Sequence, residues 1–403
     1  MRVALVGAGI VGMVAAWKLA RRGHRVTLID RGQIPNPESA SFDQHRLLHD
    51  FESSLGASVT LVRASLDGWS ELWRDLGCCF VVPAPVLAFS TAAGDLADRS
   101  VASFAQEATG YEVVERAELQ RRHPQFNLTE VRFGVVSRTG GLILASRLLL
   151  TLAERLRALD VAFVPGAAVS EIDPAQSSLV IENGTSVTAD CVVVTAGAWV
   201  RDLVPKLRRR CWAQRQVTVF PIAPKHLSPS WDTSPIIVDF GGDQGLWLAP
   251  PLGGTELKLA ASCYARPGDP ASPADRAIDN DEGARVLSHF AQHLKDAALY
   301  RVSRVESCFY SISLERRLIV EPVGTPTQPT WAICGCNGQG FKFAPLIADV
   351  IVGLVAQGAP PDTLMANAGF ASVREGASGP HGPLKCATEP NTRAPPSPAS
   401  SHH

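Results

Sequence analysis

The sequence predicts an α/β (α+β) protein of two interleaved domains, and three observations support this prediction. The chain has 403 residues, 46% of them apolar and 19% charged, so it can bury a core larger than that of one typical domain. A strand, a glycine turn, a helix and a second strand open the chain, and an apolar helix preceded by glycines follows near its end. β-rich sequence lies between these two signals, so we expect one domain to be assembled from separated segments.

The N-terminal segment carries the clearest pattern. Arg2–Val6 and 26–30 are short apolar runs, and a helical pattern over 10–21 lies between them and stops at Gly23. Continuous apolar runs are typical of parallel strands that are buried on both faces, whereas surface strands alternate. The pattern therefore predicts a β-α-β unit with the glycine-rich segment 7–12 as its first turn.

Helices and short strands alternate through the rest of the chain. The periodicity of apolar residues predicts helices over 58–76, 146–159, 281–294 and 341–355. Short runs predict strands over 80–89, 131–136, 161–164, 178–182 and 191–195, and alternating strands from 216 to 264. The tail over 370–403 is rich in Ser, Pro, Gly and Ala, and we expect it to be disordered because it cannot bury enough apolar surface to offset the entropy of ordering.

Charge and cysteine content narrow the classes of partner. The 38 basic and 39 acidic residues give a net charge of −1, so no overall field attracts nucleic acid or an anionic membrane. No uninterrupted apolar run of about 18 residues predicts a membrane span. We expect a small-molecule partner, and a monomer is favoured although no pattern tests it. Nine cysteines, an odd number, favour free thiols in a reducing compartment and hence a cytoplasmic protein.

No set of residues predicts a metal site. Cys334 and Cys336 lack the spacing of a zinc or redox pair. His289 and His293 stand four apart on a predicted helix, but no third ligand lies nearby in the sequence. We therefore expect no metal.

The segment 7–12, GAGIVG, fits the G-x-G-x-x-G fingerprint of dinucleotide binding and lies after a strand and at the start of a helix, as the fingerprint requires. Gly7 permits the tight turn, Gly9 lets backbone amides approach a pyrophosphate, and Gly12 allows close packing of helix on strand. The helix N-terminus adds positive potential. Asp30 ends the second strand, where an acid accepts hydrogen bonds from a ribose. This favours NAD or FAD over NADP but does not choose between NAD and FAD.

Four further motifs follow along the chain. They are Arg46 and His49 in the segment 43–49, Thr195-Ala-Gly-Ala-Trp199, Cys308-Phe-Tyr310, and Asn337-Gly-Gln-Gly-Phe-Lys-Phe343. In this order, and together with the glycine fingerprint, they make the chain resemble the FAD-dependent amine oxidases of the D-amino-acid oxidase superfamily. Within it, the chain is most similar to the branch of monomeric sarcosine oxidase and its N-methylamino-acid and cyclic imino-acid oxidase relatives. The resemblance extends over about residues 1–358.

The resemblance implies a fold and a cofactor. A Rossmann-like FAD-binding domain is interleaved with a β-sheet substrate domain, and the flavin lies between them. The FAD-binding domain would comprise 1–80, 141–210 and 305–365, and the substrate domain 81–140 and 211–304.

The resemblance also implies which residues line the FAD. The adenosine would contact Asp30 and Arg31, with the backbone of Val169 on the adenine side. Gly197 and Trp199 would follow a strand close to the cofactor. The pyrophosphate loop would consist of Gly7, Ala8, Gly9, Ile10, Val11 and Gly12. A last group would place backbone amides and a helix N-terminus near the flavin pyrimidine, where negative charge gathers on reduction. This group is Asn337, Gly338, Gly340, Phe341 and Lys342.

Cys308 matches the family's covalent attachment segment, in which a thiol forms a thioether to the flavin ring. The thiolate is the required nucleophile, and Arg304 could lower the pKa of this thiol. The alternative is that Cys308 is a small buried residue of a strand, as most free cysteines are. The neighbouring Tyr310 and the Gly-Phe-Lys motif ending at Lys342 favour attachment.

Five residues match catalytic positions of the family: Lys258, Lys342, Arg46, Tyr310 and His49. Lys342 would hold the substrate carboxylate with an arginine-type partner, Arg46. The phenylalanines on either side of Lys342 favour this inward placement over a solvated helix end. Lys258 would lie over the flavin and activate oxygen through its fixed charge. An outward position on an alternating strand is the equally open alternative for Lys258.

Two departures from the family pattern place sarcosine itself in doubt as the substrate. His49 stands where a second arginine is usual, which removes a permanent charge, since histidine is only partly protonated near neutrality. Ser262 stands where sarcosine oxidases carry an active-site histidine. Trp247 belongs either to the substrate wall or to the core.

The resemblance therefore predicts a flavin-dependent oxidation of an amino acid, or of an N-alkyl or cyclic amino acid, to an imine, with O2 reduced to H2O2. Three alternatives stay open. One is an FAD-dependent dehydrogenase of the same fold that uses an acceptor other than oxygen. The others are a flavoprotein subunit without turnover and a nicotinamide dehydrogenase. The sequence does not identify the substrate or the pathway.

Overall fold

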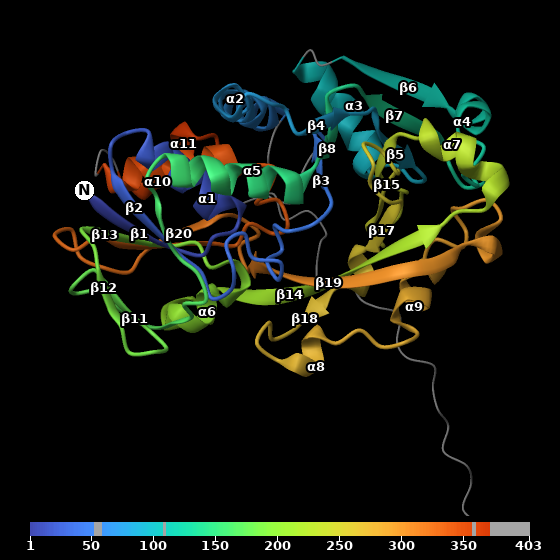
Figure 1. Cartoon of the computed structure of the whole chain (residues 1–403). Coiled ribbons are helices and arrows are strands. Elements are labelled where there is room, and N and C mark those ends of the chain that lie inside the picture. Colours follow the sequence, from blue (N-terminus) through green and yellow to red (C-terminus); the bar gives the residue numbers. More distant parts are fainter. Residues whose placement is uncertain (52–58, 108–109, 357–359, 371–403) are drawn as a thin grey trace, which may run out of the picture.

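Two large β-sheets, one of six strands and one of nine, organise the part of the chain that the structure describes. The structure is a computed structural model that describes residues 1–51, 59–107, 110–356 and 360–370. The sheets lie at opposite ends of an elongated molecule and are joined by two long strands that run lengthwise through it (Figure 1). The predicted disordered tail, 370–403, lies outside the described residues except for Phe370.

The six-stranded sheet is parallel apart from one edge strand. Its order is β20 (Ile319–Pro322), β21 (Thr330–Cys334), β13 (Cys191–Val194), β1 (Arg2–Val6), β2 (Arg25–Ile29) and β9 (Ala162–Val164), with β20 antiparallel. The strands predicted at the N-terminus and around 161–164 and 191–195 are confirmed. The sheet is assembled from three separated segments of the chain, and its central strands are buried on both faces, which is why their sequences are continuously apolar.

Different layers cover the two faces of this sheet. On one face lie α1 (Ile10–Ala20), α2 (Val59–Leu76), α5 (Ala145–Ala158), α10 (Ala344–Val355) and α11 (Pro361–Asn367), all on the same side in Figure 1. Val3 and Leu5 of β1 pack into the core with these helices. Ala4 and Val6 face the other way, against a three-stranded sheet of β10 (Val169–Asp173), β11 (Ser178–Ile181) and β12 (Ser186–Thr188) and against α6 (Val200–Leu203).

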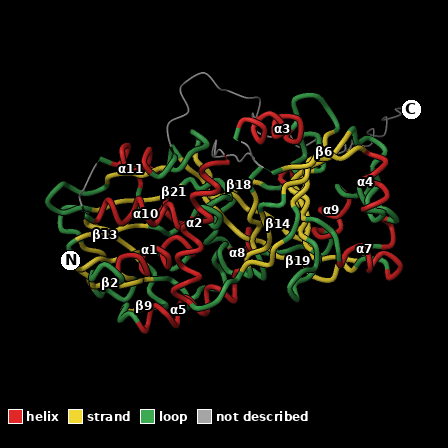
Figure 2. The backbone as a smooth tube through the Cα atoms, turned by 90° about the horizontal axis from the view of Figure 1, so that it is seen from above, coloured by secondary structure: helices red, strands yellow, loops and turns green. Residues whose placement is uncertain are grey.

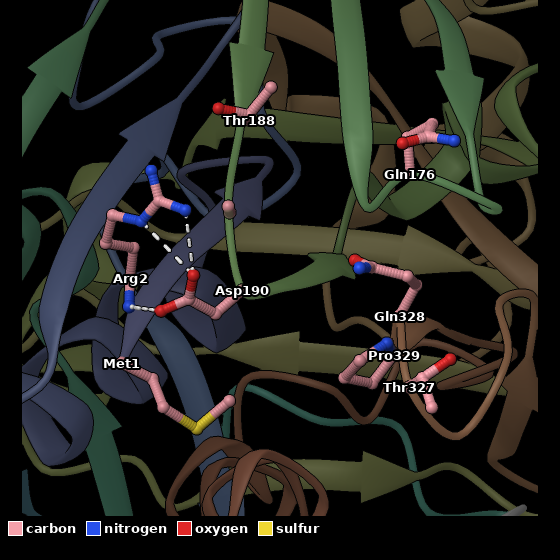
Figure 3. A pocket seen from close by; sticks show the side chains of 9 residues that line it. Met1, Arg2, Gln176, Thr188, Asp190, Thr327, Gln328 and Pro329 are labelled. Carbon is pink, nitrogen blue, oxygen red and sulfur yellow. Dashed lines mark hydrogen bonds and ion pairs between the residues drawn. The ribbon is translucent and has the colours of Figure 1, made fainter.

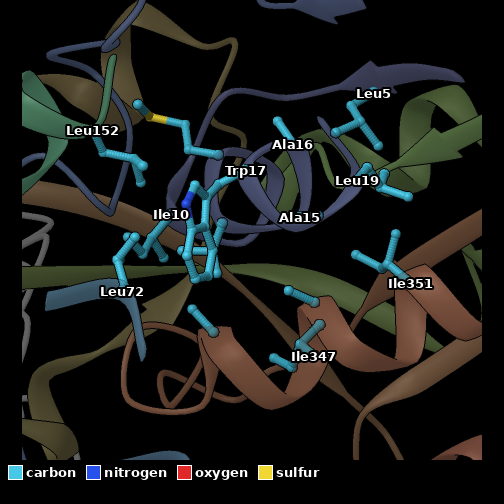
Figure 4. Close-up of a cluster of buried hydrophobic side chains, with 14 of the residues drawn as sticks. Leu5, Ile10, Ala15, Ala16, Trp17, Leu19, Leu72, Leu152, Ile347 and Ile351 are labelled. Atoms are coloured by element: carbon cyan, nitrogen blue, oxygen red, sulfur yellow. The ribbon is translucent and has the colours of Figure 1, made fainter. Parts of the chain in front are cut away.

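Helix α1 forms the centre of the first core. Its residues from Met13 to Trp17 are fully buried, with α5 and α10 packed against the helix (Figure 4). A helix that is apolar on all sides is stable only when it is enclosed on all sides. The Trp17 indole keeps its polar atom satisfied, since Nε1 donates to an oxygen of Asp75 at 2.7 Å. This packing fixes the start of α1 relative to the parallel strands.

The nine-stranded sheet is mostly antiparallel. It contains β18 (Arg266–Pro267), β14 (Cys211–Ile222), β17 (Lys258–Ala261), β16 (Leu246–Ala249), β15 (Ile236–Asp239), β5 (Val86–Ser90), β7 (Phe133–Ser137) and β6 (Tyr111–Glu115) in that order, with β19 (Arg301–Ser313) paired to β14. β14 and β19 pair antiparallel from Cys211 opposite Ser313 to Ile222 opposite Arg301. This β14–β19 ribbon connects the two ends of the molecule.

Smaller elements complete the fold. A three-stranded sheet of β3 (Arg46–His49), β8 (Gly140–Ile143) and β4 (Val81–Pro83) lies between the two large sheets, and Figure 2 shows the whole arrangement from above. The other helices are α3 (Leu96–Gln106), α4 (Arg116–Arg122), α7 (Ser228–Asp232), α8 (Pro273–Arg276) and α9 (Glu282–Ser288). Short 3-10 turns are η1 (Gly197–Trp199), η2 (Pro205–Leu207), η3 (Lys225–Leu227), η4 (Ser262–Tyr264) and η5 (Ala297–Leu299).

The short strands predicted over 80–89 are β4 and β5, with a break at Ala84. Two predicted helices differ from the structure at one end. Helix α9 ends at Ser288 rather than near 294, since the chain turns there and Leu294 bridges to Phe126. Helix α10 begins at Ala344 rather than at 341, because 341–343 form a turn. The predicted first residue of helix 58–76 lies outside the described residues.

Candidate functional site

Three neighbouring parallel strands end at the same edge of the six-stranded sheet, and each is followed by one of the predicted cofactor motifs. The glycine loop follows β1, Gly197 and Trp199 follow β13, and the segment from Asn337 to Phe341 follows β21. In open α/β sheets, ligands bind outside the carboxyl ends of the strands. The fold therefore brings together motifs that are far apart in the sequence.

Two glycines of the glycine loop have no room for a side chain. Gly7 has φ +106°, and a Cβ added there would lie 2.6 Å from the carbonyl oxygen of Thr195. A Cβ at Gly12 would lie 2.0 Å from the carbonyl oxygen of Gly7. Gly9 caps helix α1, which begins at Ile10, without a side-chain capping bond. The first amide of the helix, that of Ile10, donates to Oγ of Ser41 at 3.0 Å, so a bound anion would have to compete with this hydroxyl for the helix N-terminus.

Asp30 closes this loop from the end of β2. Its Oδ2 accepts from the amide of Ala8 at 2.8 Å, and its Oδ1 accepts from the amide of Gly32 at 2.9 Å and from Nδ2 of Asn36 at 2.8 Å. Its carbonyl accepts from the amide of Ala167, two residues before Val169 in β10. The carboxylate thus organises the loop, and its contact with a ribose stays a prediction.

Trp199 lies between two arginines. Its ring centroid is 5.1 Å from the guanidinium carbon of Arg31 and 5.7 Å from that of Arg276. The indole Nε1 is buried and has no hydrogen-bond partner among the described residues. A buried donor without a partner is costly, so this atom is available to an acceptor on a ligand.

Lys258 at the start of β17 forms a buried charge cluster with Asp43 and Arg46. The side chain of Lys258 is 1% exposed and that of Asp43 is 7% exposed. Oδ2 of Asp43 accepts from both Lys258 Nζ and Arg46 Nη1, and Arg46 Nη2 also donates to the Ala40 carbonyl. Lys258 is therefore inward, and of the two placements left open by the sequence, the outward one is wrong. Trp247 also faces this cluster, with its ring centroid 5.6 Å from Lys258 Nζ.

Cys308 lies on the β14–β19 ribbon, opposite Gln216. Burial raises the pKa of its thiol, while the charges of Arg46 and Lys258 act in the opposite direction. The expectation that Arg304 would lower this pKa is wrong. The guanidinium of Arg304 instead pairs with Glu256 and Glu306.

Lys342 forms a second buried group with His49. Lys342 is 3% exposed, and its Nζ lies 3.4 Å from Nε2 and 3.3 Å from the carbonyl oxygen of His49. Burial lowers the pKa of Lys342 to about 7, with the charge of Asp50 opposing the shift. The inward placement of Lys342 is confirmed. Burial and the Lys342 charge hold the pKa of His49 well below its usual range, so the expected partial protonation near neutrality is wrong.

The segment after β21 packs on Tyr310 and on helix α2. Asn337 has φ +50° and accepts from the amide of Ser313 at 3.0 Å. A Cβ at Gly338 would lie 3.5 Å from the Tyr310 ring. A Cβ at Gly340 would crowd Cys336, and the ring of Phe341 stacks on that of Trp69, 6.0 Å between centroids. Burial raises the pKa of Tyr310, whose hydroxyl therefore stays protonated.

One pocket, of about 330 Å³, lies at the other edge of the six-stranded sheet, before β1, β13 and β21 begin (Figure 3). The ion pair of Arg2 with Asp190, 2.8 Å between Nη2 and Oδ1, crosses it. It is therefore separate from the motifs at the carboxyl ends of the strands and takes no part in the candidate site.

The site contains residues that the sequence did not single out. Asp43 lies in the quoted segment 43–49, but its contact with Lys258 spans 215 positions of the chain. His45 is buried and neither ring nitrogen has a hydrogen-bond partner among the described residues. Asp50 accepts from Ser137 at 2.9 Å through Oδ2. The available signal was the composition of 43–50, in which only Leu47 and Leu48 are apolar.

The described residues contain neither a cluster of metal ligands nor a helix that could span a membrane. No three His, Cys, Asp or Glu side chains gather closely enough to hold a metal ion. No helix in the same residues is long and apolar enough to cross a membrane.

The residues present fit an FAD. Gly7 and Gly12 have no space for a side chain, which keeps the turn before α1 tight, and the buried Trp199 Nε1 has no partner among the described residues and can donate to a ligand. The buried Lys258 and Lys342 and the half-buried Arg46 suit a ring that gains negative charge on reduction.

Comparison with known proteins agrees with this geometry. The family model described as FAD dependent oxidoreductase matches residues 2–354. The chain is 23% identical to the peroxisomal sarcosine oxidase of Mus musculus, over 86% of this chain and 90% of that protein. It is 24% identical to the monomeric sarcosine oxidase of Bacillus sp. (strain B-0618), over 88% of this chain and 92% of that protein.

A solved structure confirms the fold class predicted from the sequence. NikD, an unusual amino acid oxidase essential for nikkomycin biosynthesis, superposes in its open form with a TM-score of 0.74. The two chains are 20% identical, and the match covers 89% of this chain and 94% of NikD. The family match over nearly all the described residues confirms the resemblance inferred from the motifs. The chain belongs to the FAD-dependent oxidoreductase family.

Proposed function

We propose that the chain is an FAD-dependent oxidase that converts an amino acid, or an N-alkyl or cyclic amino acid, to an imine and reduces O2 to H2O2. The observation that carries the proposal is the pair of buried lysines, Lys258 and Lys342, which both contact the segment 43–49. Buried charged groups with shifted pKa values cluster at functional sites. The relatives named sarcosine oxidase and N-methyl-L-tryptophan oxidase support the substrate class.

Lys342 is assigned to the substrate carboxylate. Its ammonium group is 3% exposed, and a carboxylate that approaches it would be held in a medium of low dielectric, where one ion pair is strong. His49 is neutral and can add a single hydrogen bond. The guanidinium of Arg46 is engaged with Asp43 and the Ala40 carbonyl, so we assign it to the Lys258 cluster and not to the carboxylate.

The other residues orient the reactants. When bound, FAD supplies the redox chemistry, by accepting a hydride equivalent from the carbon next to nitrogen. Tyr310 and Trp247 line the space with aromatic surface and exclude water, which strengthens the electrostatic interactions of the lysines. Lys258 keeps a positive charge at the place where oxygen takes up electrons.

We propose covalent attachment of the flavin through Cys308. The thiol lies near Arg46 and Lys258, and both charges favour its ionised form, although burial alone opposes it. Cys308 would hold the flavin as a thioether; a carbon–sulfur bond would replace a carbon–hydrogen bond, and the two electrons released would pass to the flavin and from there to O2.

Further assignments belong to the same proposal. The FAD-binding domain comprises 1–80, 141–210 and 305–365, and the substrate domain 81–140 and 211–304. The eight cysteines among the described residues are free thiols, which supports a reducing compartment and thus the cytoplasm. We propose that the protein acts as a monomer, as the name of the relative monomeric sarcosine oxidase suggests.

A second candidate is a dehydrogenase of the same fold with an acceptor other than oxygen. The ion pair of Asp43 with Lys258 favours it only in part: the carboxylate cancels some of the field that would stabilise reduced oxygen, but Arg46 leaves the cluster with a net charge of +1. The two candidates differ only in what reoxidises the flavin.

An absorption spectrum tests the proposal. The purified protein is expected to be yellow, and the colour is expected to stay with the pellet after acid precipitation of the wild type but to leave it in Cys308→Ser. An anaerobic panel of amino acids and N-alkyl amino acids should then bleach the flavin, and admission of O2 should restore it with release of H2O2. A colourless protein that does not bind FAD would refute the proposed function. Colour lost on acid treatment of the wild type would refute only the covalent bond.

A further inference from the structure

The segment 40–46 is tied to the start of β17 by its own side chains. Oε1 of Gln44 accepts from the amide of Glu256 at 2.9 Å, and Nε2 of Gln44 donates to the carbonyl of Glu256 at 3.2 Å. Glu256 stands two residues before Lys258. These two hydrogen bonds between the Gln44 side chain and the Glu256 backbone place Asp43 directly beside Lys258.

The carboxylate of Asp43 is held by fixed donors on both oxygens. Oδ1 accepts from the amide of Gln44 at 2.6 Å, and Oδ2 accepts from Lys258 and Arg46. The charges of Arg46 and Lys258 hold the pKa of Asp43 well below its usual range, although burial alone would raise it. Burial lowers the pKa of Lys258, and the charge of Asp43 opposes this shift. With Lys258 protonated, the two cations and one anion carry a net charge of +1; Lys258 and Asp43 are buried, whereas the Arg46 side chain is 20% exposed.

No other group that faces Lys258 in the described residues replaces Asp43. His45 is neutral, since burial lowers its pKa to about 3. Glu306 on β19 is paired with Arg304, and burial raises its pKa. Cys308, also on β19, is a thiol whose pKa burial raises. The rings of Phe220 and Trp247 complete the surroundings, with centroids 5.7 and 5.6 Å from the Lys258 Nζ.

We propose that Asp43 is a positioning residue for the reaction with oxygen, which holds Lys258 in one place and keeps it charged across the physiological pH range. This inference rests on the proposed oxidase function. If Asp43 is made neutral, Arg46 repels the ammonium of Lys258 and no anion compensates its burial. Lys258 then loses its proton as the pH rises through neutrality.

The neutral variant Asp43→Asn gives the test. Holoenzyme is reduced with dithionite, without any amine substrate, and the rate of reoxidation by O2 is measured from pH 6 to 8.5. The wild-type rate is expected to vary less than about twofold. In Asp43→Asn it is expected to fall about tenfold or more over the same range with one ionisation. In Asp43→Asn/Lys258→Met the rate should be low and independent of pH.

A second readout requires no turnover. Sulfite, an anion that adds to oxidised flavin, is titrated into the holoenzyme and the loss of colour is followed. At pH 6 the variant Asp43→Asn carries one more positive charge than the wild type, so sulfite should bind about tenfold more tightly. At pH 8.5 the two proteins should bind sulfite equally, since Lys258 is then neutral in the variant.

Glu256→Gln is the matched control. It makes the same chemical change two residues from Lys258, but the Glu256 side chain is exposed and pairs with Arg304. Its profiles should equal those of the wild type. If Asp43→Asn holds no flavin, Asp43→Glu keeps the charge and should stay independent of pH; a pH-dependent rate in that variant would overturn the proposal.

The outcomes separate the inference from the proposed function. A pH-independent rate and unchanged sulfite affinity in Asp43→Asn overturn the role of Asp43 and leave the oxidase in place. A wild-type reoxidation rate in Lys258→Met instead overturns the assignment of Lys258, and with it the reason for needing Asp43.

Discussion

Replacing Lys342 with methionine is expected to stabilise the folded protein, most strongly below pH 7. The ammonium group is 3% exposed, and the backbone around it is fixed because the Lys342 carbonyl accepts from Ser65 at 2.5 Å and from Trp69 at 3.1 Å. Burial lowers the pKa of Lys342 from 10.5 in the unfolded chain to about 7. The native state therefore binds fewer protons than the unfolded state between these two values, and the free energy of unfolding rises with pH there.

The magnitude follows from this gap. Each pH unit between the two pKa values corresponds to about 1.4 kcal/mol. Below pH 7 the protonated Lys342 thus lowers the free energy of unfolding by about 5 kcal/mol, and at pH 9 by about 2 kcal/mol. Methionine has similar length and no charge, so Lys342→Met should recover most of these amounts. The gain should be about 3 kcal/mol larger at pH 6 than at pH 9.

Urea unfolding followed by tryptophan fluorescence measures this difference. Wild type and variant are compared at pH 6 and pH 9 in the same flavin-loaded state and without substrate. Lys295→Met, the same change at an exposed lysine, should alter the free energy of unfolding by less than about 0.5 kcal/mol at both values. An equal gain at the two pH values, or a variant less stable than the wild type at pH 6, would refute the reasoning about Lys342.

Two further substitutions test the structure itself. Gly12→Ala should destabilise the protein by about 3 kcal/mol and abolish flavin binding, because its Cβ would lie 2.0 Å from the Gly7 carbonyl oxygen. The flavin content and the unfolding midpoint of the variant measure these two effects. A variant fully loaded with flavin would contradict the tight turn. Arg215→Met should cost about 4 kcal/mol, because it leaves the buried carboxylate of Glu282, now 2.5 Å from Nη1, without its partner. Urea unfolding checks this, and a loss below about 1 kcal/mol would show that the pair is not buried in solution.

The parts of the fold that the sequence predicted best are those whose pattern is local. The apolar runs of β1, β2 and β13 predict that these strands are buried. The spacing of the glycines in the glycine loop predicts its tight turn. Helix α9 was predicted too long because apolar residues such as Phe290 and Leu294 continue the helical spacing, although a contact with Phe126 draws the chain out of the helix. That contact joins distant segments, so no window of sequence contains it.

The same limit applies to the site. Cys308, Lys258 and Lys342 were predicted because their neighbours in the sequence match motifs of the family. Their protonation states could not be predicted from the sequence, since these depend on burial and on partners from other elements. The neutral state of His49 comes from its burial and from the ammonium group of Lys342, 293 positions away, which both lower its pKa. Asp43 has no motif of its own, and its function is visible only where three segments of chain meet.

The β14–β19 ribbon also determines how the protein can be divided. Cys211–Ile222 and Arg301–Ser313 each lead from one large sheet to the other, and residues 140–194 return to the first sheet between two contributions to the second. No single cut of the gene therefore yields a fragment that contains one whole sheet and nothing of the other. Truncated versions meant to isolate either half would carry an unpaired strand at their boundary, so engineering of this chain by fragment exchange must move both strands of the ribbon together.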